Sequence, residues 1–175
     1  DILPEEGFYW LDIEKKARKV FSYFGYLPIR TPILEDIRLF NRSLGNQTDI
    51  VKKQMFSVKR QSEEYVLRPE ATASIVRAYL ENSLDKTKGF IKLYYIGPMF
   101  RAERPQKGRL REFNHIGAEA LASKSPYLDS EIIVLADRIL KELGISGYNI
   151  KLNTLGCKED KNKFNWNSAR ETVLD

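Results

Sequence analysis

The 175-residue sequence contains one cysteine and one histidine. Cys157 has no second cysteine with which to form an intrachain disulfide, and this fits a reducing, cytoplasmic compartment. Because His115 is the single histidine, a metal site built from several histidines is excluded, and we predict no metal ligands. Because no CxxC pair or catalytic triad is apparent, zinc chemistry and nucleophilic catalysis are poorly supported.

The sequence also lacks long apolar runs and glycine-rich phosphate loops. No run approaches the roughly 18 apolar residues that a membrane span needs, and no signal-peptide pattern opens the chain. Neither GxGxxG nor GxxxxGK[ST] occurs, so side chains would have to bind any phosphate. Hydrophobic residues make up 42% of the chain and aromatic residues 11%, which predicts a folded domain with a core.

Hydrophobic periodicity predicts an α+β fold, with an antiparallel sheet flanked by helices. We expect helices over residues 5–26, 36–44, 71–84 and 127–145, an extended segment at 27–34, and strands at 55–60, 63–68, 90–101, 110–121 and 148–155. The third helix should bury Ile75, Val76, Tyr79, Leu80 and Leu84, and the fourth should bury Ile132, Leu135, Ala136, Ile139, Leu140 and Leu143.

Residues 101–111, RAERPQKGRLR, carry a net charge of +4 out of +5 for the whole chain. Pro105 and Gly108 predict a loop, in which separated cations suit a phosphate backbone and Gln106 suits a base edge. Lys107 has no assigned role and is expected to be solvated. A solvated surface loop is the ordinary alternative, so the charge alone indicates an anion-binding loop.

Arg101 and Glu103 are two residues apart after the apolar run IGPMF and should share a face. A guanidinium fork suits a phosphate, and the carboxylate could hold the fork or accept from a purine amine. The alternative is a surface ion pair worth about 0–1 kcal/mol. Their place at the end of a buried strand favours a cleft.

Further polar residues could complete this cleft. In LRPEATA, Glu70 and Thr72 suit a ligand ammonium group, although capping of the following helix explains them equally well. In REFNHIGAE, His115 and Glu119 alternate with apolar neighbours on the returning strand. The hairpin could therefore present two carboxylates, an arginine and an imidazole around one cleft.

Several segments together resemble the histidyl-tRNA synthetase family of class II aminoacyl-tRNA synthetases. GPMFRAERPQKGRLREF resembles the family's motif 2, and LRPEATA resembles its amino-acid-binding LRPEGTA. TPILEDIRLFNRSLG with TDIVKKQMF resembles motif 1, with Pro32 as the motif proline. The resemblance covers residues 1–164 in order. It implies a class II synthetase-like antiparallel sheet flanked by helices, here as an incomplete catalytic domain.

The resemblance also implies roles. Arg101 would be catalytic, binding the ATP α-phosphate and the histidine carboxylate. Other ATP contacts would be Glu103 to the adenine amine, Phe113 stacked on adenine and Arg109 at the γ-phosphate, with Mg²⁺ bridging the phosphates. Histidine would contact Glu70, Thr72, His115 and Glu119, and the tRNA acceptor end would contact Arg104, Gln106 and Arg111. Motif 1 implies a homodimer through residues of about 29–45.

The sequence departs from the family in two ways. His115 stands where the family most often has glutamine. No RGLDYY-like histidine-recognition segment, GGRYD-like motif 3 or anticodon-binding domain is found, and residues 165–175 resemble a truncated or discontinuous tail. We therefore expect an N-terminal catalytic-core portion that has weak or no ligase activity alone. The alternatives are a regulatory or binding paralogue without ligase activity and a generic basic RNA-binding domain.

Overall fold

The computed structural model describes residues 1–44, 55–104 and 106–152. The chain forms two compact units, residues 1–145 and residues 146–175. The described part of the second unit, residues 146–152, contains no helix or strand. The predicted strand at 148–155 is therefore wrong over its described residues, because none of the described strands pairs with them. The predicted tail at 165–175 lies outside the described residues.

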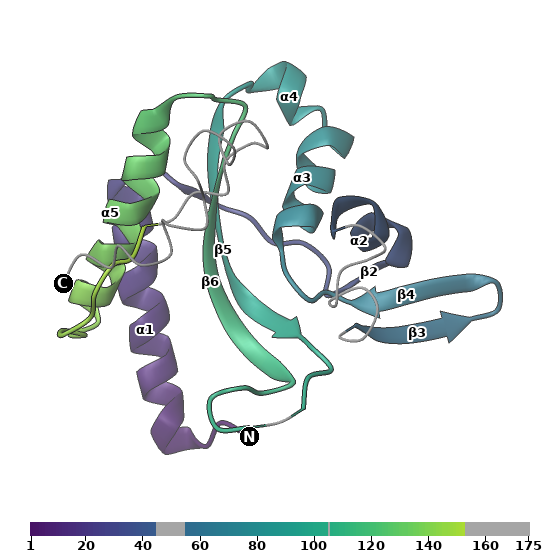
Figure 1. Ribbon diagram of the computed structural model, residues 1–175, viewed down its shortest axis with the longest axis horizontal. Helices are drawn as coiled ribbons and strands as arrows, with labels where there is room; N and C mark the ends of the chain where they lie inside the picture. The colour runs from purple at the N-terminus through teal and green to yellow at the C-terminus, as the bar shows by residue number, and fades with distance from the viewer. Residues whose placement is uncertain (45–54, 105, 153–175) are drawn as a thin grey trace, which may run out of the picture. The chain divides into compact units, whose positions relative to one another are not determined.

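A long antiparallel hairpin forms the centre of the first unit (Figure 1). It joins β5 (Ile91–Phe100) to β6 (Glu112–Leu121), pairing Ile91 with Leu121 at one end and Phe100 with Glu112 at the other. The short strand β1 (Leu27–Pro28) adds to β5 in parallel. Proline suits this edge position, since an edge strand does not need every N–H.

Two helices cover one face of this sheet, α1 (Pro4–Tyr23) and α5 (Pro126–Glu142) (Figure 1). Because strand side chains alternate, even-numbered residues of β5 and β6 face these helices. Phe21 of α1 stacks on Tyr94 with ring centroids 4.3 Å apart. The shared core consists of Ala17, Val20, Phe21, Tyr26, Tyr94 and Leu135. This face supplies much of the first unit's apolar burial.

Helix α3 (Thr72–Glu81) covers the opposite face of the hairpin, where Ile75 packs with Leu93 and Met99. It ends earlier than the sequence predicts, and a short helix, α4 (Leu84–Thr87), follows Ser83, whose φ is +53°. The turn separates the two because a left-handed residue cannot continue an α-helix.

Three side chains predicted to be buried are exposed. Val76 is 36% exposed and Leu80 56% exposed on α3, and Ala136 of α5 is also exposed. Val76 and Leu80 line a groove of about 580 Å³ that opens beside Leu39. The prediction was wrong here because periodicity identifies the apolar side of a helix without showing what covers it.

The described strands form a second sheet in the order β2-β4-β3. Its strands are β2 (Leu34–Asp36), β3 (Phe56–Arg60) and β4 (Glu63–Leu67), and α2 (Ile37–Leu44) packs its Phe40 against Val66 and Ala73. All pairings in this sheet are antiparallel, as are those of β5 and β6. The predicted α+β class is confirmed, with the strands divided between two sheets.

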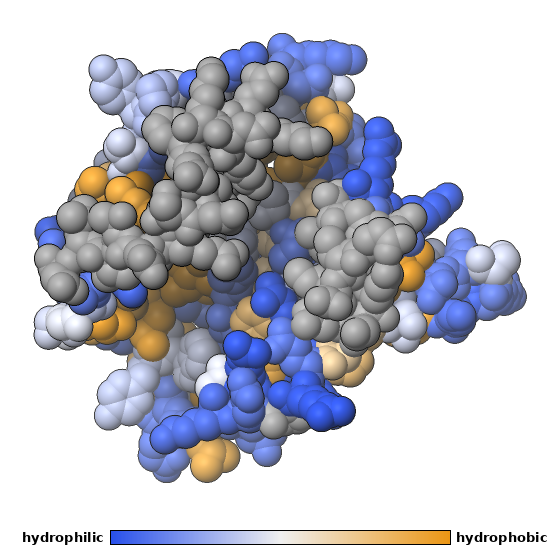
Figure 2. Space-filling model, in the orientation of Figure 1, coloured by the Kyte–Doolittle hydropathy of each residue, from blue (hydrophilic) through white to orange (hydrophobic). Residues whose placement is uncertain are grey.

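The surface of the hairpin tip is hydrophilic, as its charged residues lead one to expect (Figure 2). Figure 2 shows hydrophilic residues over the hairpin tip that joins β5 to β6. Among the described helices, none combines the length and apolar character that crossing a bilayer requires.

One close contact in the central hairpin can be tested by substitution. A Cβ on Gly117 would lie 2.2 Å from Cζ of the Tyr95 ring, so Gly117→Ala is expected to destabilise folding by about 1–3 kcal/mol through overpacking. Gly7→Ala in α1 is the control, because its Cβ would have no neighbour within 4 Å and should be neutral or slightly stabilising. Equal unfolding midpoints for the two variants in urea would contradict this packing.

Candidate active site

A buried arginine anchors the segment that leads from β4 into α3. Arg68 is 7% exposed, and its Nε donates to the Pro98 carbonyl at 3.0 Å. Its Nη1 donates to the Thr31 carbonyl at 3.0 Å and to Thr31 Oγ1 at 3.1 Å. Burial lowers the pKa of Arg68, and these acceptors offset the loss of hydration. Backbone bonds from Arg68 to Ile33 and Phe100 complete the anchor.

Arg68 requires glycine at position 97. A Cβ there would lie 2.9 Å from Arg68 Nη2, so a larger residue would displace the guanidinium. Arg68 thereby holds its neighbour Pro69 at the end of β5, where the Pro69 carbonyl accepts from Arg101 Nε at 3.0 Å. The Arg101 guanidinium lies over the Phe113 ring, 5.2 Å from its centroid. Among the described residues, none accepts a hydrogen bond from its Nη groups.

Arg101 and Phe113 belong to a cleft of about 480 Å³ near the hairpin tip, whose described lining residues are Arg101, Glu103, Gly108, Arg109, Leu110 and Phe113. All four residues predicted to bind ATP are thus together. Glu103 pairs with Arg109 at 3.7 Å, and not with Arg101 as the surface-pair alternative supposed. Because the Arg109 side chain is 65% exposed, this pair is weak and can open at little cost.

Glu70, Thr72 and Glu119 meet at the start of α3. The Glu70 carboxylate accepts from the backbone N–H groups of Thr72 at 2.6 Å and Ala73 at 3.0 Å. The Thr72 hydroxyl donates to Glu119 at 2.6 Å. Glu70 therefore caps the helix, as one alternative predicted, and also stands with Glu119 in an acidic corner. Burial raises the pKa of Glu119, the Thr72 hydroxyl opposes that shift, and the Glu70 charge adds to it.

His115 lies on the same face of the hairpin, beside a residue that the sequence did not single out. Its Nδ1 is 3.4 Å from the Tyr95 hydroxyl, and the two rings meet edge to face with centroids 5.4 Å apart. Burial, and then the charge of Arg101, lower the pKa of His115, while Glu70 opposes them. The alternation of β5 could have identified Tyr95, since odd-numbered residues from Leu93 to Arg101 share this face.

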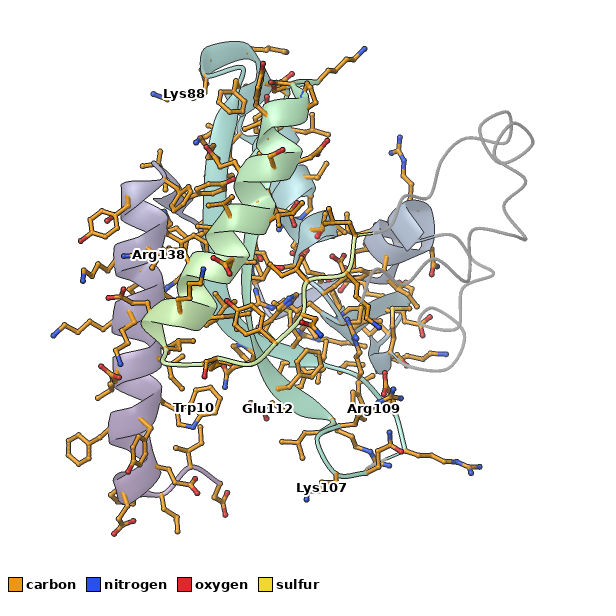
Figure 3. The ribbon with its side chains drawn as sticks, turned by 60° about the vertical axis from the view of Figure 1, so that its left-hand side comes forward. Trp10, Lys88, Lys107, Arg109, Glu112 and Arg138 are labelled. Carbon is orange, nitrogen blue, oxygen red and sulfur yellow. The ribbon has the colours of Figure 1, made fainter. Side chains whose placement is uncertain are left out.

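The residues predicted to contact tRNA lie on the hairpin tip next to the cleft, and none of them is among its described lining residues. Gln106 and Arg109 form an isolated bridge, with the Arg109 N–H donating to the Gln106 carbonyl at 2.9 Å, and Gly108 turns the chain with φ +79°. Figure 3 shows Lys107 and Arg109 on this tip. The side chains of Arg104, Gln106 and Arg111 are exposed. Pro105, which was predicted to shape the loop, lies outside the described residues.

The described ranges hold no group of three or more His, Cys, Asp or Glu residues arranged to bind a metal ion. The cleft and the acidic corner are instead built from arginines, paired carboxylates and aromatic rings. Such a set suits a small ligand with anionic and cationic ends.

Comparisons with known proteins identify what this site is similar to. The family model for histidyl-tRNA synthetase matches residues 1–170. A histidine–tRNA ligase of Solibacter usitatus (strain Ellin6076) is 50% identical over 157 residues, which are 89% of this chain and 38% of that protein. The chain thus spans about two fifths of the length of such relatives.

Two solved structures are similar as well. Apo histidyl-tRNA synthetase of S. aureus has a TM-score of 0.66 and 35% identity, covering 81% of this chain and 32% of that one. A Bacillus halodurans C protein described as an ATP phosphoribosyltransferase regulatory subunit/histidyl-tRNA synthetase has a TM-score of 0.70 and 29% identity, covering 83% and 37%. The predicted class II synthetase-like fold is confirmed.

The acidic corner predicts a pH-dependent effect on stability. Because the pKa of Glu119 is raised above its ordinary 4.5, folding disfavours its ionised form, and this contribution to stability falls as pH rises through that raised pKa. Glu119→Gln stays neutral and keeps an acceptor for Thr72. It is therefore expected to be more stable than the parent at about pH 8, with the difference narrowing towards about pH 4.

Urea unfolding of both proteins at the two pH values measures this difference. Glu112→Gln is the matched control, since Glu112 is exposed on the same strand and its loss should change the midpoint little at either pH. A Glu119→Gln variant less stable than the parent at the higher pH would contradict the unfavourable burial of this carboxylate.

Proposed function

Because the chain belongs to the histidyl-tRNA synthetase family, we propose that it provides the ATP- and histidine-binding part of a histidine–tRNA ligase. In that reaction, histidine and ATP form histidyl-adenylate and pyrophosphate, and the histidyl group is then transferred to tRNA(His) with release of AMP. One observation carries the proposal: Arg101 lies over the Phe113 ring in one cleft with Glu103 and Arg109.

ATP, as its magnesium complex, is the substrate proposed for the cleft. The volume of about 480 Å³ is within the range of small-molecule sites. Arg101 would bind the α-phosphate and Phe113 would stack on adenine, while Glu103 would accept from the adenine amine. Arg109 would meet the γ-phosphate, which requires that it leave Glu103. The weak 3.7 Å pair permits that exchange.

Histidine would bind between Arg101 and the acidic corner. Glu70, Thr72 and Glu119 suit the ammonium and imidazole groups, because two carboxylates and a hydroxyl converge there. Arg101 would hold the histidine carboxylate against the α-phosphate. As a carboxylate oxygen forms its bond to phosphorus, pyrophosphate leaves with the bonding pair, and the guanidinium offsets the charge that develops.

The proposal also covers the tRNA contacts, the oligomeric state and the cellular compartment. The exposed Arg104, Gln106 and Arg111 would contact the tRNA acceptor end. Residues of about 29–45 would contribute to a homodimer, which the exposed Ile33 and Leu34 support. The cytoplasm is the proposed compartment, in keeping with the cysteine content.

The second candidate function is that of a regulatory or binding paralogue without ligase activity. It is considered because the Bacillus halodurans relative is described both as a regulatory subunit and as a histidyl-tRNA synthetase. The retention of Arg101, Glu103, Arg109 and Phe113 in one cleft supports the ligase instead. Titration with ATP separates the two, because a paralogue with a degenerate nucleotide site should not bind it. A generic RNA-binding domain predicts salt-sensitive tRNA binding and no histidine binding.

Histidine-dependent ATP–pyrophosphate exchange tests the proposal. It should be weak or absent in the 175-residue chain and robust in a form extended to the length of the relatives. Arg101→Ala should lower exchange by about 10²–10³-fold or more, because it removes charge stabilisation in the transition state. Lys107→Ala is the control and should retain exchange. Robust exchange by the 175-residue chain would contradict its proposed dependence on further segments, and none by the extended form would overturn the substrate assignment.

Transfer to tRNA should separate from activation. Gln106→Ala removes an exposed hydrogen-bonding group from the hairpin tip, outside the set of residues that line the cleft. It is expected to leave exchange unchanged and to slow single-turnover transfer from the adenylate by about three- to tenfold. Equal losses in exchange and in transfer would indicate that Gln106 maintains the shape of the cleft and does not act through the tRNA.

A further inference from the structure

The Tyr95 hydroxyl and the His115 ring make a polar contact beside apolar residues on this face of the hairpin. Tyr95 is 8% exposed and packs in the cluster of Ala71, Ile75, Leu93 and Met99. Its ring lies so close to Gly117 that no Cβ could be accommodated there. The ring is therefore fixed, and its hydroxyl is directed at His115 Nδ1, 3.4 Å away.

The protonation of both groups follows from their surroundings. Burial raises the pKa of Tyr95, and the charges of Glu119 and Glu70 add to that shift, so the phenol keeps its proton at neutral pH and has one to donate to His115 Nδ1. Burial and Arg101 lower the pKa of His115 against the opposing charge of Glu70, so its imidazole is neutral there. A neutral imidazole that accepts at Nδ1 must carry its proton on Nε2.

The ring edge that carries Nε2 lies away from Tyr95. The groups that act on His115 are Tyr95 from β5, Arg101 from the segment after β5, Phe113 from β6 and Glu70 from the segment before α3. Arg101 acts electrostatically on His115, so an Nε2–H on this ring would be a second donor for an anionic group bound by Arg101. Under the proposed function, that group is the carboxylate of histidine.

We propose that Tyr95 is a positioning residue that fixes the tautomer and ring orientation of His115, so that His115 Nε2–H donates to the substrate carboxylate beside Arg101. Without the hydroxyl, the imidazole can present an unprotonated nitrogen, which repels a carboxylate. Below the pKa of His115 both ring nitrogens carry protons, so the orientation matters less. This inference rests on the proposed function for the identity of the ligand.

Tyr95→Phe tests the inference with minimal change to packing. Calorimetric titration of histidine, in the form that carries exchange activity, should show binding weaker by about three- to tenfold at neutral pH, converging with the parent in acid. In a His115→Gln background the same substitution should change affinity less than twofold. Tyr94→Phe is the matched control, because Tyr94 is the neighbouring tyrosine and packs against α1 on the opposite face.

Two results would overturn the inference: parent-like affinity for Tyr95→Phe at neutral pH, or an equal loss when His115 is absent, which would assign Tyr95 to packing alone. Since the chain has a single histidine, ¹⁵N-histidine labelling of the ligand-free chain reports the His115 tautomer directly. We expect Nε2–H alone in the parent and a mixture in Tyr95→Phe. If no histidine binds, the proposed function fails, and this spectrum still decides the Tyr95–His115 contact.

Discussion

The candidate site depends on one buried guanidinium. A charge taken out of water is tolerated when hydrogen bonds replace lost hydration, and Nε and Nη1 of Arg68 donate to main-chain and side-chain oxygens from two distant segments. The same requirement holds Thr31 beside β5 and keeps position 97 free of a side chain. Pro69 and Glu70 then follow at fixed places, one directing Arg101 and the other capping α3. Backbone groups therefore orient Arg101 and Glu70 of the candidate site.

The two faces of the β5–β6 hairpin divide stability and chemistry between them. One face is apolar and is covered by α1 and α5. The other holds the buried Tyr95 and the half-buried His115 and Glu119, and burial shifts the pKa of each towards its neutral form. This arrangement is common where binding groups must be held before a ligand arrives.

The sequence predicted most elements of the first unit, because its helices and strands have clear periodicities and its turns have glycine or left-handed residues. Periodicity could not tell that Val76, Leu80 and Ala136 are uncovered, since coverage depends on distant elements. The strand predicted at 148–155 is wrong over residues 148–152 for a related reason: β-forming residues make a strand only when a neighbouring strand pairs with them. The candidate site residues came from alternation and from resemblance. The Arg68 contacts were missed because they join segments whose meeting no local pattern encodes. The Glu103–Arg109 pair was missed because both residues lie in the loop region, where strand alternation does not give side-chain directions.

The separation in sequence between α1 and α5 has a consequence for the order in which this molecule can fold. The β5–β6 hairpin closes a short loop, so its pairing has a small entropic cost and can begin as soon as residue 121 is available. Part of its apolar face stays uncovered until α5 is present, because α5 follows β6 in the sequence and ends at Glu142. During synthesis Phe21 of α1 can already stack on Tyr94, whereas Ile132, Leu135 and Ile139 of α5 are still missing from the shared core. The interval before residue 142 emerges is when a nascent chain of this kind most needs protection from aggregation.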